Sequence, residues 1–238
     1  MMVDATILNV IRLMTGTILL AYASYTDLKT RRASNILWVI MGLVGIILLI
    51  IQYLGGGFPN LWYLVFIPIM IVLVYAFFQL RLLFGGADTK ALMALAILVP
   101  IQPLIGAFPF WPSFLPGSFC IFLNALLLFL FIPVSLFLFN IGKRNLRFPH
   151  CLLGYVVSVE KAKQTFVWPM EKIQDGKRKL VYMPKDYDAA EELAEFEKLG
   201  IKEIWVTPKI PFMIPLLAGF LATFILGDIL FQIIRVLI

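Results

Sequence analysis

The chain has 238 residues, of which 61% are hydrophobic and only 14% are charged, and its mean hydropathy is +0.94. Ordinary soluble domains hold about 45–50% apolar and about 25% charged residues, so one globule cannot bury this excess. The composition excludes an ordinary soluble enzyme and predicts a polytopic membrane protein. The net charge is +6. Because the basic residues gather in short loops between apolar runs, they favour anchoring at an anionic inner leaflet over nucleic acid binding.

Apolar runs in the first 140 residues predict five transmembrane helices, over residues 5–26, 36–53, 61–83, 91–107 and 118–140. The first run lacks a basic segment before it and a small-residue cleavage site after it, so we expect it to be retained rather than cleaved as a signal peptide. The fourth run contains Pro100 and Pro103, so it should be kinked or end early and leave an irregular segment. The proline-rich, aromatic residues 108–117 are typical of a connector in the headgroup zone.

Residues 141–209 carry most of the charge and have a different pattern. Aromatic and β-branched residues predict short strands near 155–157, 166–168, 180–182 and 204–206. The spacing of apolar residues predicts a helix over 186–199 that ends at Gly200. A sixth apolar run follows at about 212–236. We therefore predict a membrane all-α fold, a bundle of six transmembrane helices with a small α+β cytoplasmic domain inserted between helices five and six. Its parts are 1–140, 141–209 and 210–238.

The basic residues also predict the orientation. The loops after the first, third and fifth runs contain lysine and arginine, whereas the loops after the second and fourth contain neither. Positive loops remain in the cytoplasm, so both termini are predicted outside, and the inserted domain and the short basic loops inside. The expected localisation is the cytoplasmic membrane.

Two acidic residues are predicted to meet at this cytoplasmic surface. Asp27 closes the first run, and Asp88 lies in the loop Gly85-Gly86-Ala87-Asp88-Thr89-Lys90, just before the fourth. The two glycines predict that another backbone segment approaches Asp88 closely. Acids at span ends beside basic residues are often interfacial ion pairs, and that alternative stays open for each acid alone. Taken together, the shared surface and the glycine pair favour a functional site.

Two carboxylates in one site share a proton, so one can activate water while the other polarises a peptide carbonyl. This is aspartyl proteolysis, and it requires no metal and no other cofactor. We expect Asp88 to be the more readily ionised acid, because it would lie at a helix N-terminus. The lone histidine, His150, is expected to be interfacial, and Cys120 and Cys151 are expected to be small buried side chains.

These residues resemble the archaeal preflagellin peptidases, within the type IV prepilin peptidase family of G-x-G-D membrane aspartyl proteases. The resemblance rests on the Gly85–Lys90 loop, on Asp27-Leu28-Lys29 with Arg31 and Asn35, and on Trp205-Val206-Thr207-Pro208 before the last helix. It implies that Asp27 and Asp88 are the catalytic pair.

The resemblance also implies a substrate. The family removes short basic leader peptides from archaellin or pilin-like precursors at the cytoplasmic face, just before an apolar helix. Ala87 stands where the motif has its second glycine, and a methyl group there restricts φ to negative values. The cysteine-rich methyltransferase region of bacterial relatives is absent from the sequence, so no N-methylation is expected.

Other residues are candidates for substrate contact or have structural explanations. Lys29 and Asn35 are candidate substrate contacts. A basic leader could meet Glu191, Glu192, Glu195 or Glu197 on the predicted helix, although such acids more often form a solvated helix face. Asp228, in the sixth run, is interpreted as a polar contact between helices. The expected partners are precursor proteins and membrane lipids, with no nucleic acid.

Three alternative functions follow from the same features. A presenilin-type intramembrane protease would hold both aspartates deeper within apolar spans. A transporter would use intramembrane acids near the midplane. A non-enzymatic scaffold would act through the inserted domain.

Overall fold

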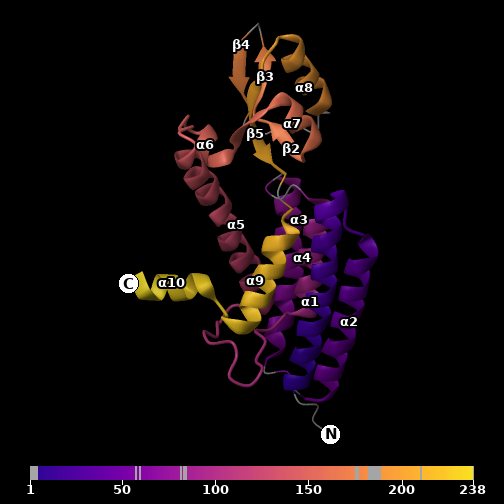
Figure 1. The fold of residues 1–238 in the computed structure, drawn as a ribbon. Coiled ribbons are helices and arrows are strands. Elements are labelled where there is room, and N and C mark those ends of the chain that lie inside the picture. The colour runs from indigo at the N-terminus through magenta and orange to yellow at the C-terminus, as the bar shows by residue number, and fades with distance from the viewer. Residues whose placement is uncertain are drawn as a thin grey trace. The chain divides into compact units, whose positions relative to one another are not determined.

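Figure 1 shows the computed structural model, which describes residues 5–56, 58, 60–80, 82, 85–174, 177–181, 189–209 and 211–237. The chain forms two compact units. Unit 1 comprises Met1–Phe129 and Pro211–Ile238, and unit 2 comprises Leu130–Ile210. The long helix α5 (Gly117–Gly142) contributes residues to both units.

Unit 1 is helical. Its elements are α1 (Ala5–Thr30), α2 (Asn35–Leu54), the 3-10 helix η1 (Leu61–Val65), α3 (Phe66–Gln79), α4 (Gly86–Leu98), the first half of α5, α9 (Met213–Ile225) and α10 (Ile229–Leu237). Among the described residues, four helical segments are long and apolar enough to cross a membrane, namely α1, α2, η1 with α3, and α5. These segments correspond to the first, second, third and fifth predicted spans, and the chain is a multi-pass membrane protein. Arg81, predicted near the end of the third span, lies outside the described residues.

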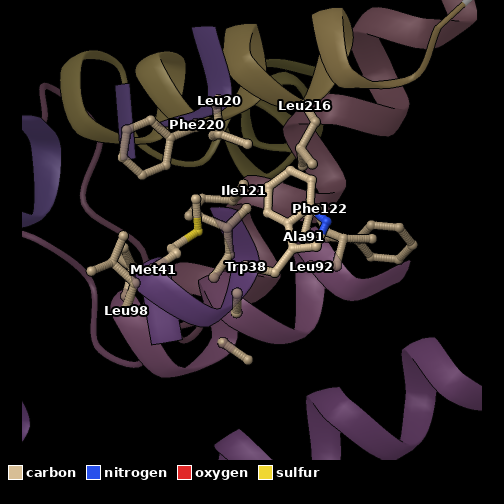
Figure 2. Packing of buried hydrophobic residues seen from close by; sticks show 14 of the residues in the cluster. Leu20, Trp38, Met41, Ala91, Leu92, Leu98, Ile121, Phe122, Leu216 and Phe220 are labelled. Atoms are coloured by element: carbon tan, nitrogen blue, oxygen red, sulfur yellow. The ribbon is translucent and has the colours of Figure 1, made fainter. Parts of the chain in front are cut away.

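Helix α4 forms the centre of unit 1, although it has only 13 residues. Ala91, Leu92 and Leu95 are fully buried, and α4 packs closely against both α2 and α3. Gly45 of α2 permits this approach, since a Cβ there would lie 2.9 Å from the Leu98 backbone. Figure 2 shows the resulting apolar cluster, in which side chains of α2, α4, α5 and α9 meet. Helix α4 ends at Leu98, two residues before Pro100, as predicted for a proline-broken run.

Helices α1 and α9 pack side by side in opposite directions. Near the end of α1, Ser24 Oγ donates a hydrogen bond of 3.0 Å to the carbonyl of Met213, the first residue of α9. About two turns nearer the start of α1, Gly16 contacts the ring of Phe220, where a Cβ would overlap the ring. The small residues Gly16 and Ser24 therefore allow α9 to pack closely against α1.

The predicted sixth span is not one continuous helix. Helix α9 ends at Ile225 and α10 begins at Ile229, and Gly227 between them has φ of +93°. The apolar run over 212–236 gave no indication of this break apart from the Gly227-Asp228 pair. Figure 1 shows α10 leaving the end of α9 in a different direction.

Unit 2 contains a three-stranded antiparallel sheet in the order β1-β5-β2, with β1 (Tyr155–Ser158), β2 (Val167–Pro169) and β5 (Glu203–Pro208). A separate hairpin pairs β3 (Glu171–Gln174) with β4 (Lys177–Leu180). The short helices α6 (His150–Leu153) and α7 (Val159–Gln164) and the longer α8 (Ala189–Lys198) complete the unit. The unit thus has the predicted α+β character, but its charged strand β3 was missed, because Glu171 and Lys172 gave no strand pattern.

Helix α8 confirms the predicted amphipathic pattern. Leu193 and Phe196 are buried in the core of unit 2, and Gly200, with φ of +69°, ends the helix by donating to the Glu197 carbonyl. The predicted starting residue of this helix, Asp186, and Tyr182 of the predicted third strand lie outside the described residues.

His150 is buried, 3% exposed, with its ring 5.3 Å from the Trp205 ring centroid. The expectation of an interfacial histidine is therefore wrong, because the fold of unit 2 encloses this residue. Cys120 and Cys151 are buried free thiols, as predicted.

Candidate active site

Asp27 lies in the last turn of α1 and is half-buried. The helix ends three residues later at Thr30, and Arg31 adopts a left-handed conformation with φ of +55°. In this turn the Arg31 amide donates to the Asp27 carbonyl over 3.0 Å. An arginine in this region is uncommon, and such strain clusters at functional sites. This hydrogen bond holds the backbone of Asp27 in place at the end of α1.

Asp88 lies in the first turn of α4, as the third residue of that helix. Gly85 precedes the helix in an extended conformation, with φ of −96° and ψ of +116°. Both the amide and the hydroxyl of the buried Thr89 donate to the Gly85 carbonyl, over 3.1 and 3.0 Å. These two bonds fix the N-terminus of α4. Thr89 is a positioning residue that the sequence did not single out, although its place inside the motif was a signal.

Gly85 is required for space rather than for an unusual backbone angle. A Cβ at this position would overlap Asp88 Oδ2 and lie 2.7 Å from Asp88 Cγ. The group close to the acid is the backbone of Gly85 itself, rather than the second backbone segment that the two glycines were predicted to admit. At Gly86 the nearest atom to an added Cβ, on the Phe78 ring, is 4.0 Å away, so that position has room for a methyl group.

Ala87 is accommodated where the motif has glycine. It lies within α4 and packs, partly buried, against the apolar core of unit 1. A helical residue has negative φ, which alanine adopts without strain. The methyl group at this position is therefore compatible with the observed site.

The Asp27 and Asp88 carboxylates are near enough to interact electrostatically. Burial, and after it the negative charge of Asp27, together raise the pKa of Asp88 to about 7. The helix N-terminus was expected to favour the ionised form of Asp88. Removal of the carboxylate from water and repulsion from a second carboxylate outweigh that effect. Both effects oppose the easy ionisation that was expected of Asp88, and a pKa near 7 leaves this carboxyl group partly protonated in neutral solution.

Lys90 and Asn35 meet beside this pair. Lys90 Nζ donates a hydrogen bond of 2.9 Å to Asn35 Oδ1, which joins the first turn of α4 to the first residue of α2. Ser34 precedes α2 without a side-chain cap, and the Asn35 side-chain oxygen accepts from Lys90. Lys29 instead lies over the Tyr25 ring, 4.6 Å from its centroid.

The three candidate glutamates lie on α8, in unit 2. Glu191 and Glu195 are exposed, and Glu192 is half-buried. Burial raises the pKa of Glu192, and the positive charge of Lys172 opposes this shift. The nearby Glu197 forms an ion pair with Lys163. The structure therefore shows an acidic exposed face on α8, and its part in substrate binding stays a prediction.

Comparison with known proteins identifies relatives of this chain. Curated relatives named preflagellin peptidase are 27% identical over 241 residues in Methanococcus voltae and 28% identical over 230 residues in Methanocaldococcus jannaschii. Each alignment covers 92% of this chain, and 96% and 94% of the respective relative.

Two family descriptions match different parts of the chain. Residues 146–229 match the archaeal peptidase A24 C-terminus, type II. Residues 14–138, more than half of the chain, match the type IV leader peptidase family. This second match includes Asp27, Asp88 and the glycine loop between α3 and α4. The chain therefore belongs to the type IV leader peptidase family.

Proposed function

We propose that this protein is a membrane aspartyl endopeptidase that removes the leader peptide from archaellin or type IV pilin-like precursors at the cytoplasmic membrane face. The observation that carries the proposal is the electrostatic coupling of Asp27 and Asp88, which come from helices distant in the sequence. The family match and the relatives named preflagellin peptidase support this assignment.

The raised pKa of Asp88 assigns complementary roles to the two acids. Protonated Asp88 donates a hydrogen bond to the oxygen of the scissile carbonyl, which makes the carbon more electrophilic. Ionised Asp27 accepts a proton from a water molecule as the water oxygen attacks that carbon. The tetrahedral intermediate then collapses when the carbon–nitrogen bond breaks and the amine leaves with a proton from the pair. Every proton is returned, so the pair is ready for another turnover.

The surrounding residues position this pair. Gly85 leaves room for the Asp88 carboxylate, and Thr89 fixes the first turn that carries it. The Lys90–Asn35 bond joins α4 to α2 at the same end of unit 1. A positioned carboxylate contributes to catalysis because small displacements of reacting groups are costly in rate.

Substrate binding follows from charge and hydrophobicity. The leader peptide is basic and precedes an apolar helix, so the exposed acids Glu191 and Glu195 offer complementary charge. The apolar helix of the precursor enters unit 1 from the lipid. The positions of Asp27 and Asp88 at helix ends, rather than in the middle of apolar helices, favour cleavage at the membrane surface over presenilin-type cleavage within the bilayer.

Precursor cleavage tests the proposal directly. Membranes containing wild type, Asp27→Asn or Asp88→Asn are mixed with a tagged archaellin precursor, and the shortened product is followed. Both variants should lose cleavage, while the exposed Glu160→Gln variant, matched in chemistry, should retain the wild-type rate. Full processing by either aspartate variant would exclude a catalytic pair.

A further inference from the structure

Hydrogen bonds from the connector and from α5 hold the break between α9 and α10. The carbonyls of Ile225 and Leu226, at the end of α9, accept from the amides of Phe110 and Trp111 over 3.1 and 2.8 Å. Gly227 follows with no room for a side chain, since a Cβ would overlap the Trp111 carbonyl oxygen. The connector between α4 and α5 therefore receives the end of α9 through backbone contacts that only glycine permits at this position.

Asp228 begins the next helix. It is 1% exposed, and its Oδ1 accepts from the Phe231 amide over 2.9 Å, which caps the N-terminus of α10. Its Oδ2 accepts from Ser113 Oγ over 2.6 Å, and its own amide donates to the Trp111 carbonyl over 3.1 Å. Asp228 is therefore a polar contact, but its main partners are the connector and the helix that it caps, rather than a second helix as predicted.

Asn124 of α5 completes the joint. Its amide nitrogen donates to the Gly227 carbonyl over 2.7 Å, and its oxygen accepts from the Ile229 amide over 3.3 Å. Unpaired backbone groups cost several kcal/mol in an apolar environment. Because the groups freed by the break are paired, α9 and α10 are two separate helices with a defined joint, rather than a distorted single span.

Helix α10 has an exposed apolar surface. Its nine residues extend about 14 Å, less than half of the roughly 30 Å hydrocarbon core. Gln232 and Arg235 are three positions apart and share one edge of the helix. The other residues are apolar, and those with large exposed side chains are Phe231, Ile233, Ile234, Val236 and Leu237.

This helix lies at the end of unit 1 opposite Asp27 and Asp88. Because α9 runs antiparallel to α1, with Met213 beside Ser24, the end of α9 lies near the beginning of α1. The connector at this end presents exposed aromatic rings, and Phe114 packs edge-on against Phe231 of α10 with centroids 5.8 Å apart. Exposed aromatic residues beside apolar spans are typical of the headgroup region.

We propose that α10 lies in the lipid headgroup region, on the membrane surface opposite the aspartate pair, with its apolar face in lipid and Gln232 and Arg235 toward water. The bilayer is the occupant of this face because α10 continues directly from helices that lie in the membrane and is joined to an aromatic connector. Its only charged residue, Arg235, lies on the polar edge, where it reaches lipid phosphates. The Asp228 joint sets the direction of the helix.

Nitroxide labelling of the full chain in phosphatidylcholine vesicles tests this placement. Single cysteines replace Gln232, Ile233, Ile234 and Arg235 in turn, and the unsubstituted chain measures any labelling of the buried Cys120 and Cys151. Collision with oxygen, which concentrates in lipid, should exceed collision with a water-soluble nickel chelate severalfold at 233 and 234. The ratio should reverse at 232 and 235.

Two results would overturn the proposal. A steady rise of the oxygen-to-nickel ratio along α10, without helical period, indicates a helix that enters the bilayer. Low collision with both reagents at 233 and 234 indicates that a second copy of the chain covers this face.

The joint is tested separately. Asp228→Ala removes both side-chain bonds and should abolish the periodic contrast, whereas Asp228→Asn retains acceptor capacity and should preserve much of it. Ser113→Ala removes one bond and should weaken the contrast, which provides a milder variant if Asp228→Ala does not fold. An unchanged contrast in Asp228→Ala and Ser113→Ala would show that the joint does not set the helix direction.

Discussion

The sharpest test of the site is the addition of one methyl group at Gly85. In Gly85→Ala the new Cβ would overlap Asp88 Oδ2 and lie 2.7 Å from Asp88 Cγ. Ordinary contacts of this kind begin near 3.4 Å, so Cγ must move by roughly 0.7 Å and the overlapping Oδ2 must move farther. Displacements near 1 Å cost about 100-fold in rate, so we expect cleavage to fall by about 10- to 100-fold.

The backbone conformation of Gly85 shows that a loss of cleavage in Gly85→Ala would come from the contact with Asp88 rather than from backbone strain. Gly85 has φ of −96°, which alanine adopts freely, so the substitution strains no dihedral angle. The matched control is Gly86→Ala, one residue later, where the nearest atom to the new Cβ is 4.0 Å away. Alanine in a helix is more favourable than glycine by about 1 kcal/mol, so this variant should fold at least as well and cleave within about twofold of wild type.

The assay is the initial rate of precursor cleavage by purified protein in proteoliposomes, with thermal unfolding measured on the same samples. Slow cleavage by Gly85→Ala with normal unfolding, together with normal cleavage by Gly86→Ala, supports the steric account. Equal rates in the two variants would refute the reasoning that Gly85 makes room for the Asp88 carboxylate.

Three further predictions concern the same end of unit 1. Because the pKa of Asp88 is raised to about 7, the protonated form that donates to the carbonyl is lost as the pH rises. The cleavage rate should therefore decline through about pH 7, and a rate that is constant from pH 6 to 9 would contradict the assignment of Asp88 as the acid. Lys90→Met and Asn35→Ala each break the 2.9 Å bond between α4 and α2. The double variant should then be no slower than the slower single variant, whereas additive losses would show that the two residues act independently. Ala87→Gly should retain activity but lower the free energy of unfolding by about 0.5–1 kcal/mol, because glycine is unfavourable in a helix; a gain in activity of tenfold or more would show that the methyl group distorts the site.

Hydropathy and charge predicted a large part of this architecture, because the bilayer imposes a simple rule on apolar runs. A run of about 20 apolar residues must satisfy its backbone internally, so helices α1, α2 and α5 were recognised with bounds close to those observed. The α+β character of unit 2 was predicted from residue types: β-branched and aromatic residues indicated β1 and β5, and the spacing of apolar residues among charged ones indicated helix α8. Strand β3 was not predicted, because its pairing with β4 rather than its own composition makes it a strand.

The sequence by itself identified the candidate site residues, namely Asp27, Asp88 and the glycines before Asp88, because an acid beside an apolar run is costly without a function or a partner. Only the tertiary structure decided what surrounds them. Burial and a second carboxylate, rather than the helix N-terminus, set the protonation of Asp88. The end of α9 at Gly227 was likewise decided by tertiary contacts, because the groups that pair with it come from the connector and from α5. Local sequence specifies helices and exposed acids, whereas the energies of packing and hydrogen bonding depend on residues that are distant along the chain.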